Sequence, residues 1–219
     1  MAHWATGRTK ALLSSEKSLK TVEDLLSAVK DGQGKPSAGE RAIFAAAVVF
    51  LYGIWENYAE QLAIELVSYV ANEIDAAKVP DQVRKSLEKK SAWELTVSPG
   101  WRALWVHSVK ITAVGDDGDR FGMNTARAGQ VKHLLSTSGA PDPFISVPLS
   151  AIPTHLATTA SDISDAINKL VELRGDIVHT GQVPPTLRKS HVLGWKAFVK
   201  EVCEHVDSSS RSQCKNLVS

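Results

Sequence analysis

The chain contains 219 residues, of which 43% are hydrophobic and 22% are charged. These values are typical of a globular protein with one domain, and they exclude a disordered or fibrous chain. The formal net charge is only +1. Nucleic acid could therefore be attracted only by a local cluster of Lys and Arg, because the whole molecule has no strong positive field.

The sequence indicates a cytoplasmic protein that does not enter a membrane. The first ten residues lack the apolar core of a signal peptide, and the longest uncharged run, residues 42–55, is shorter than the ~20 residues that span a bilayer. The two cysteines, Cys203 and Cys214, would close only a short loop if they were bonded to each other. We therefore expect both thiols to be reduced.

Two helices are predicted in the first third of the chain. Residues 8–30 carry apolar side chains at helical spacing, which predicts a helix with one apolar face. Ser37 followed by Glu40 is typical of a capping box at the start of a second helix. The proline-free segment 37–77 is apolar nearly all round in its first half and amphipathic in its second half. This pattern predicts a central, buried helix.

Further helices are predicted along the rest of the chain, where no convincing strand alternation occurs. They span 81–90, 100–112, 124–137 (capped by Asn124), 154–178 and 186–206. The segment Asp207–Ser212 is interpreted as a short low-complexity tail. The sequence therefore predicts an all-α fold, with a single domain over residues 1–219. This domain is a helical bundle with an inserted loop and helix segment at about 91–153.

One short segment combines an arginine, an acid and a histidine at the end of a predicted helix. Arg174, Asp176 and His179 fall within six residues, and Gly181 follows as a helix stop. Residues five apart lie about 140° apart around an ideal helix, so Arg174 and His179 do not share a face. If they act together, either the last turn is distorted or the two groups meet across a symmetric interface. The alternative is that both side chains only compensate the helix dipole.

This Arg-x4-His segment, ELRGDIVHTG, resembles the signature of the HEPN superfamily. The segment LYGIWENYAEQL, residues 51–62, is also similar to the long helix of that superfamily. The nearest resemblance is to the RiboL-PSP-HEPN group and its MAE-type relatives, which are often encoded in bacterial defence and toxin loci. It covers about 37–77 and 154–200, and it leaves most of the insertion unexplained.

The resemblance implies a helical bundle that forms a homodimer in which two Arg-x4-His motifs face each other. Arg174 and His179 then become the catalytic pair. The residue after the arginine is commonly polar in this superfamily but is Gly175 here, and Asp176 could supply the polar group one position later. Glu56 and Asn57 look like the polar residues that support such sites; the alternative is a buried, hydrogen-bonded pair with a packing role.

The function implied is a metal-independent endoribonuclease of a prokaryotic defence or toxin–antitoxin type system. His179 would transfer protons, and Arg174 would hold the phosphate. The expected partners are RNA, a second copy of the chain, and an antitoxin or another defence-system protein. The alternative is a non-catalytic HEPN module that binds a partner or serves as a scaffold in a defence complex. Some HEPN toxins are silenced by nucleotide transfer onto a tyrosine two residues after the histidine, a position that is Gly181 here.

Two further groups of residues are weaker candidates for RNA contacts. The cations Lys85, Lys89, Lys90, Arg188 and Lys189 could bind the RNA backbone, although such runs usually form a solvated face. The tryptophans Trp93, Trp101 and Trp105 could stack on bases, but we favour a small hydrophobic core. No histidine or cysteine cluster has zinc spacing, and no phosphate-binding loop occurs. We therefore expect no metal and no cofactor.

Overall fold

The computed structural model describes residues 7–29, 35–88, 100–116 and 122–219, and within these ranges it is all-helical, with no strand. The helices are α1 (Lys10–Ser27), α2 (Ala38–Glu73), α3 (Asp81–Glu88), α5 (Trp101–Val114), α6 (Ala128–Thr137), α7 (Ile163–Thr180) and α8 (Lys189–Val218). Three single 3-10 turns, η2 (Ala76–Lys78), η3 (Leu149–Ala151) and η4 (Thr154–Leu156), lie in the connections. The predicted all-α class is confirmed.

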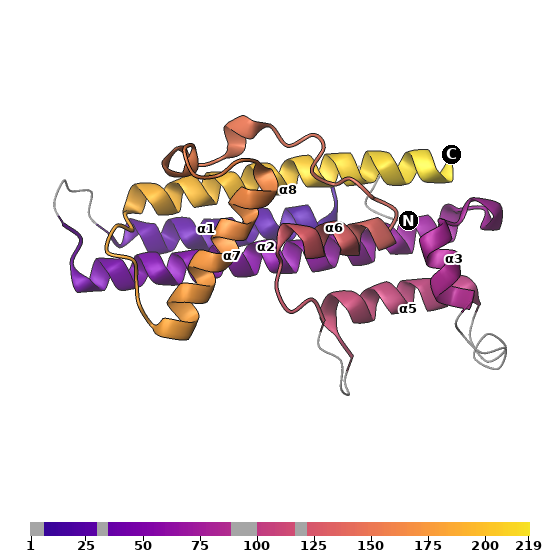
Figure 1. The fold of residues 1–219 in the computed structure, drawn as a ribbon, viewed down its shortest axis with the longest axis horizontal. Helices are drawn as coiled ribbons and strands as arrows, with labels where there is room; N and C mark the ends of the chain where they lie inside the picture. Colours follow the sequence, from indigo (N-terminus) through magenta and orange to yellow (C-terminus); the bar gives the residue numbers. More distant parts are fainter. Residues whose placement is uncertain (1–6, 30–34, 89–99, 117–121) are drawn as a thin grey trace.

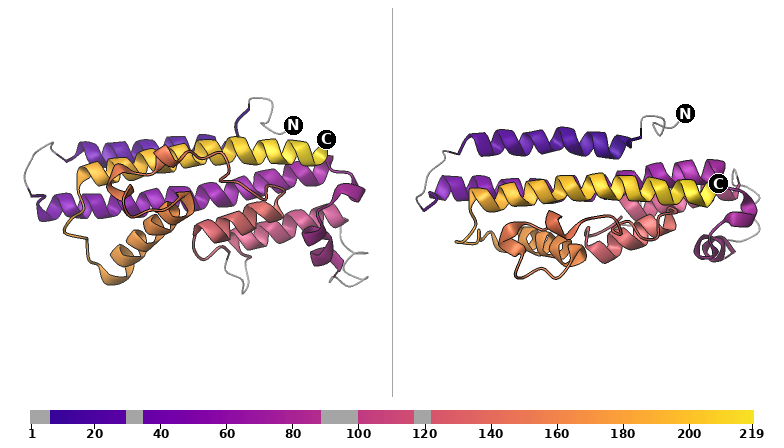
Figure 2. Two further views of the ribbon diagram at one scale, coloured as in Figure 1. Left: turned by 45° about the horizontal axis from the view of Figure 1, so that its top comes forward. Right: turned by 90° about the horizontal axis from the view of Figure 1, so that it is seen from above.

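Helix α2 is the centre of the fold, and α1, α5, α6, α7 and α8 all pack against it. Figures 1 and 2 show α2 and α8 side by side along the length of the molecule. In the right-hand view of Figure 2, α1 covers one side of this pair, while α6 and α7 lie on the other. The predicted capping box starts α2: the Glu40 N–H donates to Ser37 Oγ, and the Ser37 N–H donates to the Glu40 carboxylate at 2.7 Å.

Helix α2 is long and apolar enough to cross a membrane, but 56% of its most apolar stretch is buried inside the molecule. Its second half is enclosed, with Leu62, Leu66, Val67 and Val70 fully buried. Burial of one such side chain contributes about 1.5–3 kcal/mol. The burial of this helix is that of a core helix.

The segment between α5 and α6 is tied to α2 through both polar groups of one residue. The Ala126 N–H donates to the Tyr52 hydroxyl at 3.1 Å, and the Ala126 carbonyl accepts from Trp55 Nε1 at 2.8 Å. Ala126 is fully buried and lies outside any helix. These two bonds therefore satisfy backbone groups that neither water nor a helix could satisfy. The described part of the predicted insertion therefore shares its core with the central helix.

The predicted cap of the helix after this segment is wrong. Helix α6 begins at Ala128, with Arg127 rather than Asn124 at the N-cap position. The Ala128 N–H instead donates to Asn168 Oδ1 of α7 at 3.1 Å. A side chain remote in sequence thus satisfies the open helix end, and no local pattern could have indicated it.

Tryptophans 101 and 105 belong to the packing of α5. Trp105 is buried and donates from Nε1 to the Thr137 carbonyl at 2.8 Å. Arg102 lies over the Trp101 ring and donates to the Ala71 and Ile74 carbonyls at the end of α2. Arg102 thus satisfies open carbonyls at a helix end, and its guanidinium packs on Trp101. Since Trp105 is buried as well, the packing interpretation holds for Trp101 and Trp105. Trp93 lies outside the described residues.

The last two predicted helices differ in their bounds. Residues 154–156 form only a 3-10 turn, and α7 begins at Ile163, capped by the Asp162 side chain. The prediction of a low-complexity tail at Asp207–Ser212 is wrong, because α8 continues through these residues to Val218. The polar run is buried where Asp207 accepts from the Thr9 N–H at 3.3 Å, from the Thr9 hydroxyl, and from Arg211 Nε at 2.7 Å.

This arrangement predicts that Asp207→Ala destabilises the protein strongly. Asp207 is only 1% exposed, and its removal leaves the Arg211 guanidinium and the Thr9 N–H without their acceptor. We expect a loss of about 3 kcal/mol in the free energy of unfolding, measured by urea denaturation. Ser208→Ala, on the exposed side of the same turn, should change it by less than about 0.5 kcal/mol. Equal effects of the two substitutions would contradict this account.

Candidate functional site

The Arg-x4-His motif lies on the last turns of α7, which is helical without interruption up to Thr180. Gly181 then adopts the left-handed conformation (φ 66°), and its N–H donates to the Ile177 carbonyl at 3.1 Å. A non-glycine residue would be strained at this φ. The last turn is therefore regular, and Arg174 and His179 point away from each other within one chain.

Arg174 is held against the central helix by an aromatic ring. Its guanidinium carbon lies 4.9 Å from the centroid of the Tyr52 ring, a cation–π contact. The Tyr52 hydroxyl donates to the Glu56 carboxylate at 2.6 Å and accepts from the Ala126 N–H. Arg174 Nε is buried and has no hydrogen-bond partner among the described residues. The cation is thus fixed in position while one of its donors stays unpaired.

The Tyr52 side chain, on whose ring the Arg174 guanidinium lies, stays uncharged at cellular pH. Burial first, and then the hydrogen bond to the Glu56 carboxylate, raises the pKa of Tyr52 to about 12. A neutral phenol keeps the hydrogen in its bond to Glu56 and offers its ring face to the guanidinium. Tyr52 is therefore a supporting residue of the site.

Glu60 extends this polar line along α2, at positions 52, 56 and 60 of one helix face. Burial first, and the Glu56 carboxylate second, raise the pKa of Glu60 from 4.5 to about 7. Neither Tyr52 nor Glu60 was among the predicted site residues. The signal that could have found them is a row of polar groups four residues apart within an otherwise apolar helix.

The structure separates the two supporting residues predicted on α2. Glu56 is half-buried and faces Tyr52, whereas Asn57 is exposed. Asn57 lines a shallow groove with Ile177 of α7, so it lies beside the motif but not beside Arg174. The alternative of a buried, hydrogen-bonded Glu56–Asn57 pair is wrong, because Asn57 is solvated.

The other residues of the motif lie on the solvent side of α7. His179 and Asp176 are both exposed. A Cβ atom added at Gly175 would meet only His179 Cδ2, at 4.0 Å, so space does not require a glycine there. The histidine ring therefore lies over position 175, one turn back along the helix.

The predicted basic residues that the structure describes lie in two separate parts of the molecule, on α3 and at the start of α8. Lys85 is exposed on α3, near the end of the molecule opposite to the end of α7 (Figure 1). Lys189 Nζ donates to the Val29 carbonyl at 2.9 Å, and Arg188 donates to the Pro185 and Leu187 carbonyls. Both thus carry structural bonds near the start of α8. Lys89 and Lys90 lie outside the described residues.

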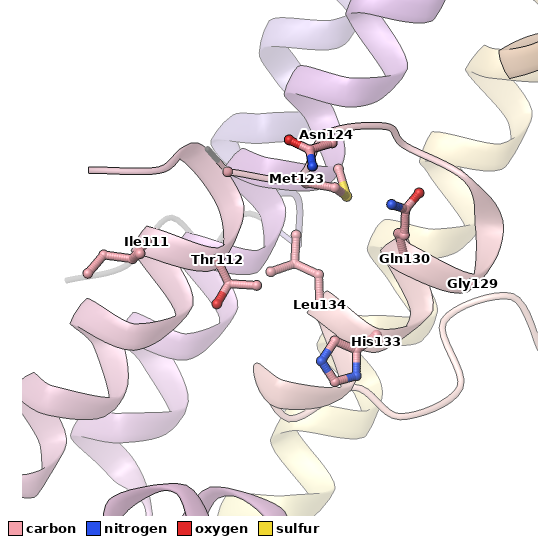
Figure 3. Close-up of a pocket in the computed structure, with 9 residues that line it drawn as sticks. Ile111, Thr112, Met123, Asn124, Gly129, Gln130, His133 and Leu134 are labelled. Carbon is pink, nitrogen blue, oxygen red and sulfur yellow. The ribbon is translucent and has the colours of Figure 1, made fainter. Parts of the chain in front are cut away.

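A separate hollow of about 660 Å³ lies between α5, residues 122–124 and α6, and is lined by His133, Asn124 and Gln130 among others (Figure 3). At its edge, the Met123 N–H donates to the Ala113 carbonyl at 2.9 Å. No predicted site residue lines this hollow. Among the described residues, no three His, Cys, Asp or Glu side chains come together as metal ligands.

Both cysteines are free and buried, and burial raises the pKa of each thiol. A thiol in this state is a poor nucleophile.

The chain matches no protein-family model, no curated protein and no solved structure.

The raised pKa of Glu60 predicts an effect of Glu60→Gln that depends on pH. Wild-type Glu60 is protonated without penalty below pH 4.5, and its contribution to stability is lost as the pH rises from there through about 7. Because Glu60 is only half-buried, solvent screening reduces the full effect of this pKa change, and we expect the variant to be more stable than wild type by about 1 kcal/mol at pH 8 and to differ little at pH 4.5. Urea denaturation at both pH values measures this, and equal differences at the two values would contradict it.

Proposed function

We propose that the chain is a metal-independent endoribonuclease of a prokaryotic defence or toxin–antitoxin type system, with Arg174 and His179 as its catalytic residues in a homodimer. One observation carries the proposal. A guanidinium fixed on an aromatic ring and an exposed imidazole lie on one short helix segment but on different faces of it.

These two groups suit RNA cleavage by the 2′-hydroxyl of the substrate itself. His179 takes the proton of the 2′-hydroxyl as its oxygen attacks the neighbouring phosphorus, and the imidazolium that results gives this proton to the departing 5′-oxygen. Arg174 donates to the non-bridging phosphate oxygens, on which charge builds. The products are a 2′,3′-cyclic phosphate and a 5′-hydroxyl.

A homodimer would bring together the arginine and the histidine that point apart within one chain. In a two-fold dimer, His179 of one protomer approaches the Arg174 region of its partner, and two equal sites form. One face of α2 supports such an interface, because residues that share it are solvent-exposed although they are mostly apolar: Ala42, Ala46, Phe50, Gly53 and Asn57. The apolar groove on this face reaches Ile177, and Val178 beside it is 47% exposed.

The alternative is a non-catalytic HEPN module that binds a partner or serves as a scaffold in a defence complex. It is favoured by the cation–π contact of Arg174, which a purely structural arginine would also make. In this case the exposed face of α2 receives a different protein, and isolated chain cleaves no RNA.

The decisive test is cleavage of total cellular RNA in EDTA by wild type, Arg174→Ala, His179→Ala and a mixture of the two variants. Each variant alone should lose about 10²-fold or more of the activity, because each removes one charge or proton-transfer group. The mixture should recover about a quarter of the wild-type activity, since half of the randomly exchanged dimers carry one intact site of two.

His107→Ala and Lys110→Ala, at exposed positions of α5, are the matched controls and should cleave like wild type. Recovery in the mixture identifies a site shared between protomers. Loss in both variants without recovery would place the whole site in one chain. Cleavage that requires added magnesium would refute the mechanism, and absence of cleavage by every protein would favour the scaffold function.

A further inference from the structure

A second cavity, of about 470 Å³, borders the same helix on another side. It lies between α7, the η4 turn, residues 184–187 and the first turns of α8. Its volume is within the range of small-molecule sites in proteins. Its walls are aliphatic side chains, one indole, two imidazoles and a few charged groups of α7. No residue of the proposed catalytic pair lines it.

Two stacked imidazoles form the most distinctive wall of this cavity. The rings of His155 and His191 lie 4.5 Å apart between centroids and are inclined by 22°. The edge contact of His155 with Trp195 (5.5 Å, 78°) joins them to the core, where Trp195 meets Phe198. These contacts fix the orientation of the imidazole pair, so it is already arranged for a planar ligand.

The environment keeps both imidazoles neutral near pH 7. Burial lowers the pKa of each, and His191 lowers that of His155 further, as Arg188 does that of His191. A neutral imidazole offers one N–H donor and one nitrogen acceptor. The pair therefore combines an aromatic surface with both kinds of hydrogen-bonding group, which is what the polar edge of a heteroaromatic base requires.

The charges around the cavity favour a base over a phosphate. Glu172 and Asp176 both line it, and the Asp176 carboxylate has no ion-pair partner among the described residues. The cation that lines the cavity, Lys169, forms an ion pair with Asp165 at 3.5 Å. A free carboxylate repels an anion, but it accepts hydrogen bonds from an amino group of a base or from a ribose hydroxyl.

His179 does not line the cavity, but it lies one turn beyond Asp176, which does. Asp176 and His179 are three residues apart, so they are neighbours on the helix surface, about 5–6 Å apart at Cβ. Arg174 lies on a different side, over Tyr52. A base seated against Asp176 would thus hold its own ribose close to His179.

We propose that this cavity binds one heteroaromatic base of an RNA substrate, with the attached ribose directed toward His179. Its place in the reaction rests on the proposed ribonuclease function, but base binding itself does not depend on cleavage. The His155–His191 stack supplies the aromatic surface, and Asp176 supplies an acceptor at the edge nearest the motif. The cavity then selects which base precedes or follows the cleaved bond.

The test is titration of the full chain with the four nucleoside 5′-monophosphates, ribose 5-phosphate and inorganic phosphate, followed by calorimetry. We expect at least one nucleotide to bind about ten-fold or more tightly than ribose 5-phosphate and phosphate. His155→Ala and Thr186→Trp should weaken this binding by about ten-fold or more. Thr186 is an exposed residue at the cavity wall, so the larger side chain in Thr186→Trp should fill the cavity without disturbing the core.

Thr21→Trp, at an exposed position of α1, is the matched control and should bind like wild type. Equal binding of nucleotides and base-free phosphates would overturn the proposal, as would no nucleotide binding by wild type or full binding by Thr186→Trp. Nucleotide binding without RNA cleavage would refute the ribonuclease but keep the base site. Cleavage with unchanged base preference in Thr186→Trp would refute the base site alone.

Discussion

The fold depends on the need to cover one long apolar helix. Helix α2 runs from Ala38 to Glu73, and every other long helix of the described chain packs against it. Water would be in contact with a large apolar surface if these helices were absent, and this is the main driving force for the bundle. Side chains remote in sequence satisfy open helix ends in this bundle, as Asn168 does at the start of α6 and Arg102 at the end of α2.

Within this apolar helix, one line of polar residues organises the candidate site. The Tyr52 hydroxyl joins Glu56 to the Ala126 backbone, and its ring face carries the Arg174 guanidinium. The same tyrosine thus connects α2 with the 122–127 segment and with α7. A change at this ring would affect both packing and the position of the proposed catalytic cation, so stability and activity are coupled here.

Helix α7 presents different chemistry on its different sides. Arg174 faces α2, Ile177 faces the apolar groove, and Asp176 borders the cavity with the stacked histidines. This division follows from the 100° rotation per residue of a regular helix. In the proposed enzyme, one side holds the phosphate, a second contacts the other protomer, and a third holds a base. Each function can therefore be tested by substitutions that leave the other two sides intact.

The sequence by itself determined the helical class, the capping box at Ser37, the approximate position of most helices and the residues of the Arg-x4-His motif. These features depend on neighbours a few residues apart, which periodicity and caps record. Only the tertiary structure decided that Asp207 is buried against Thr9 and that α8 runs to Val218. It also decided that Glu56 and Asn57 face different surroundings, and that His155 stacks on His191. These are contacts between segments far apart in the chain, or choices between helix sides, and they depend on which surfaces the packing buries.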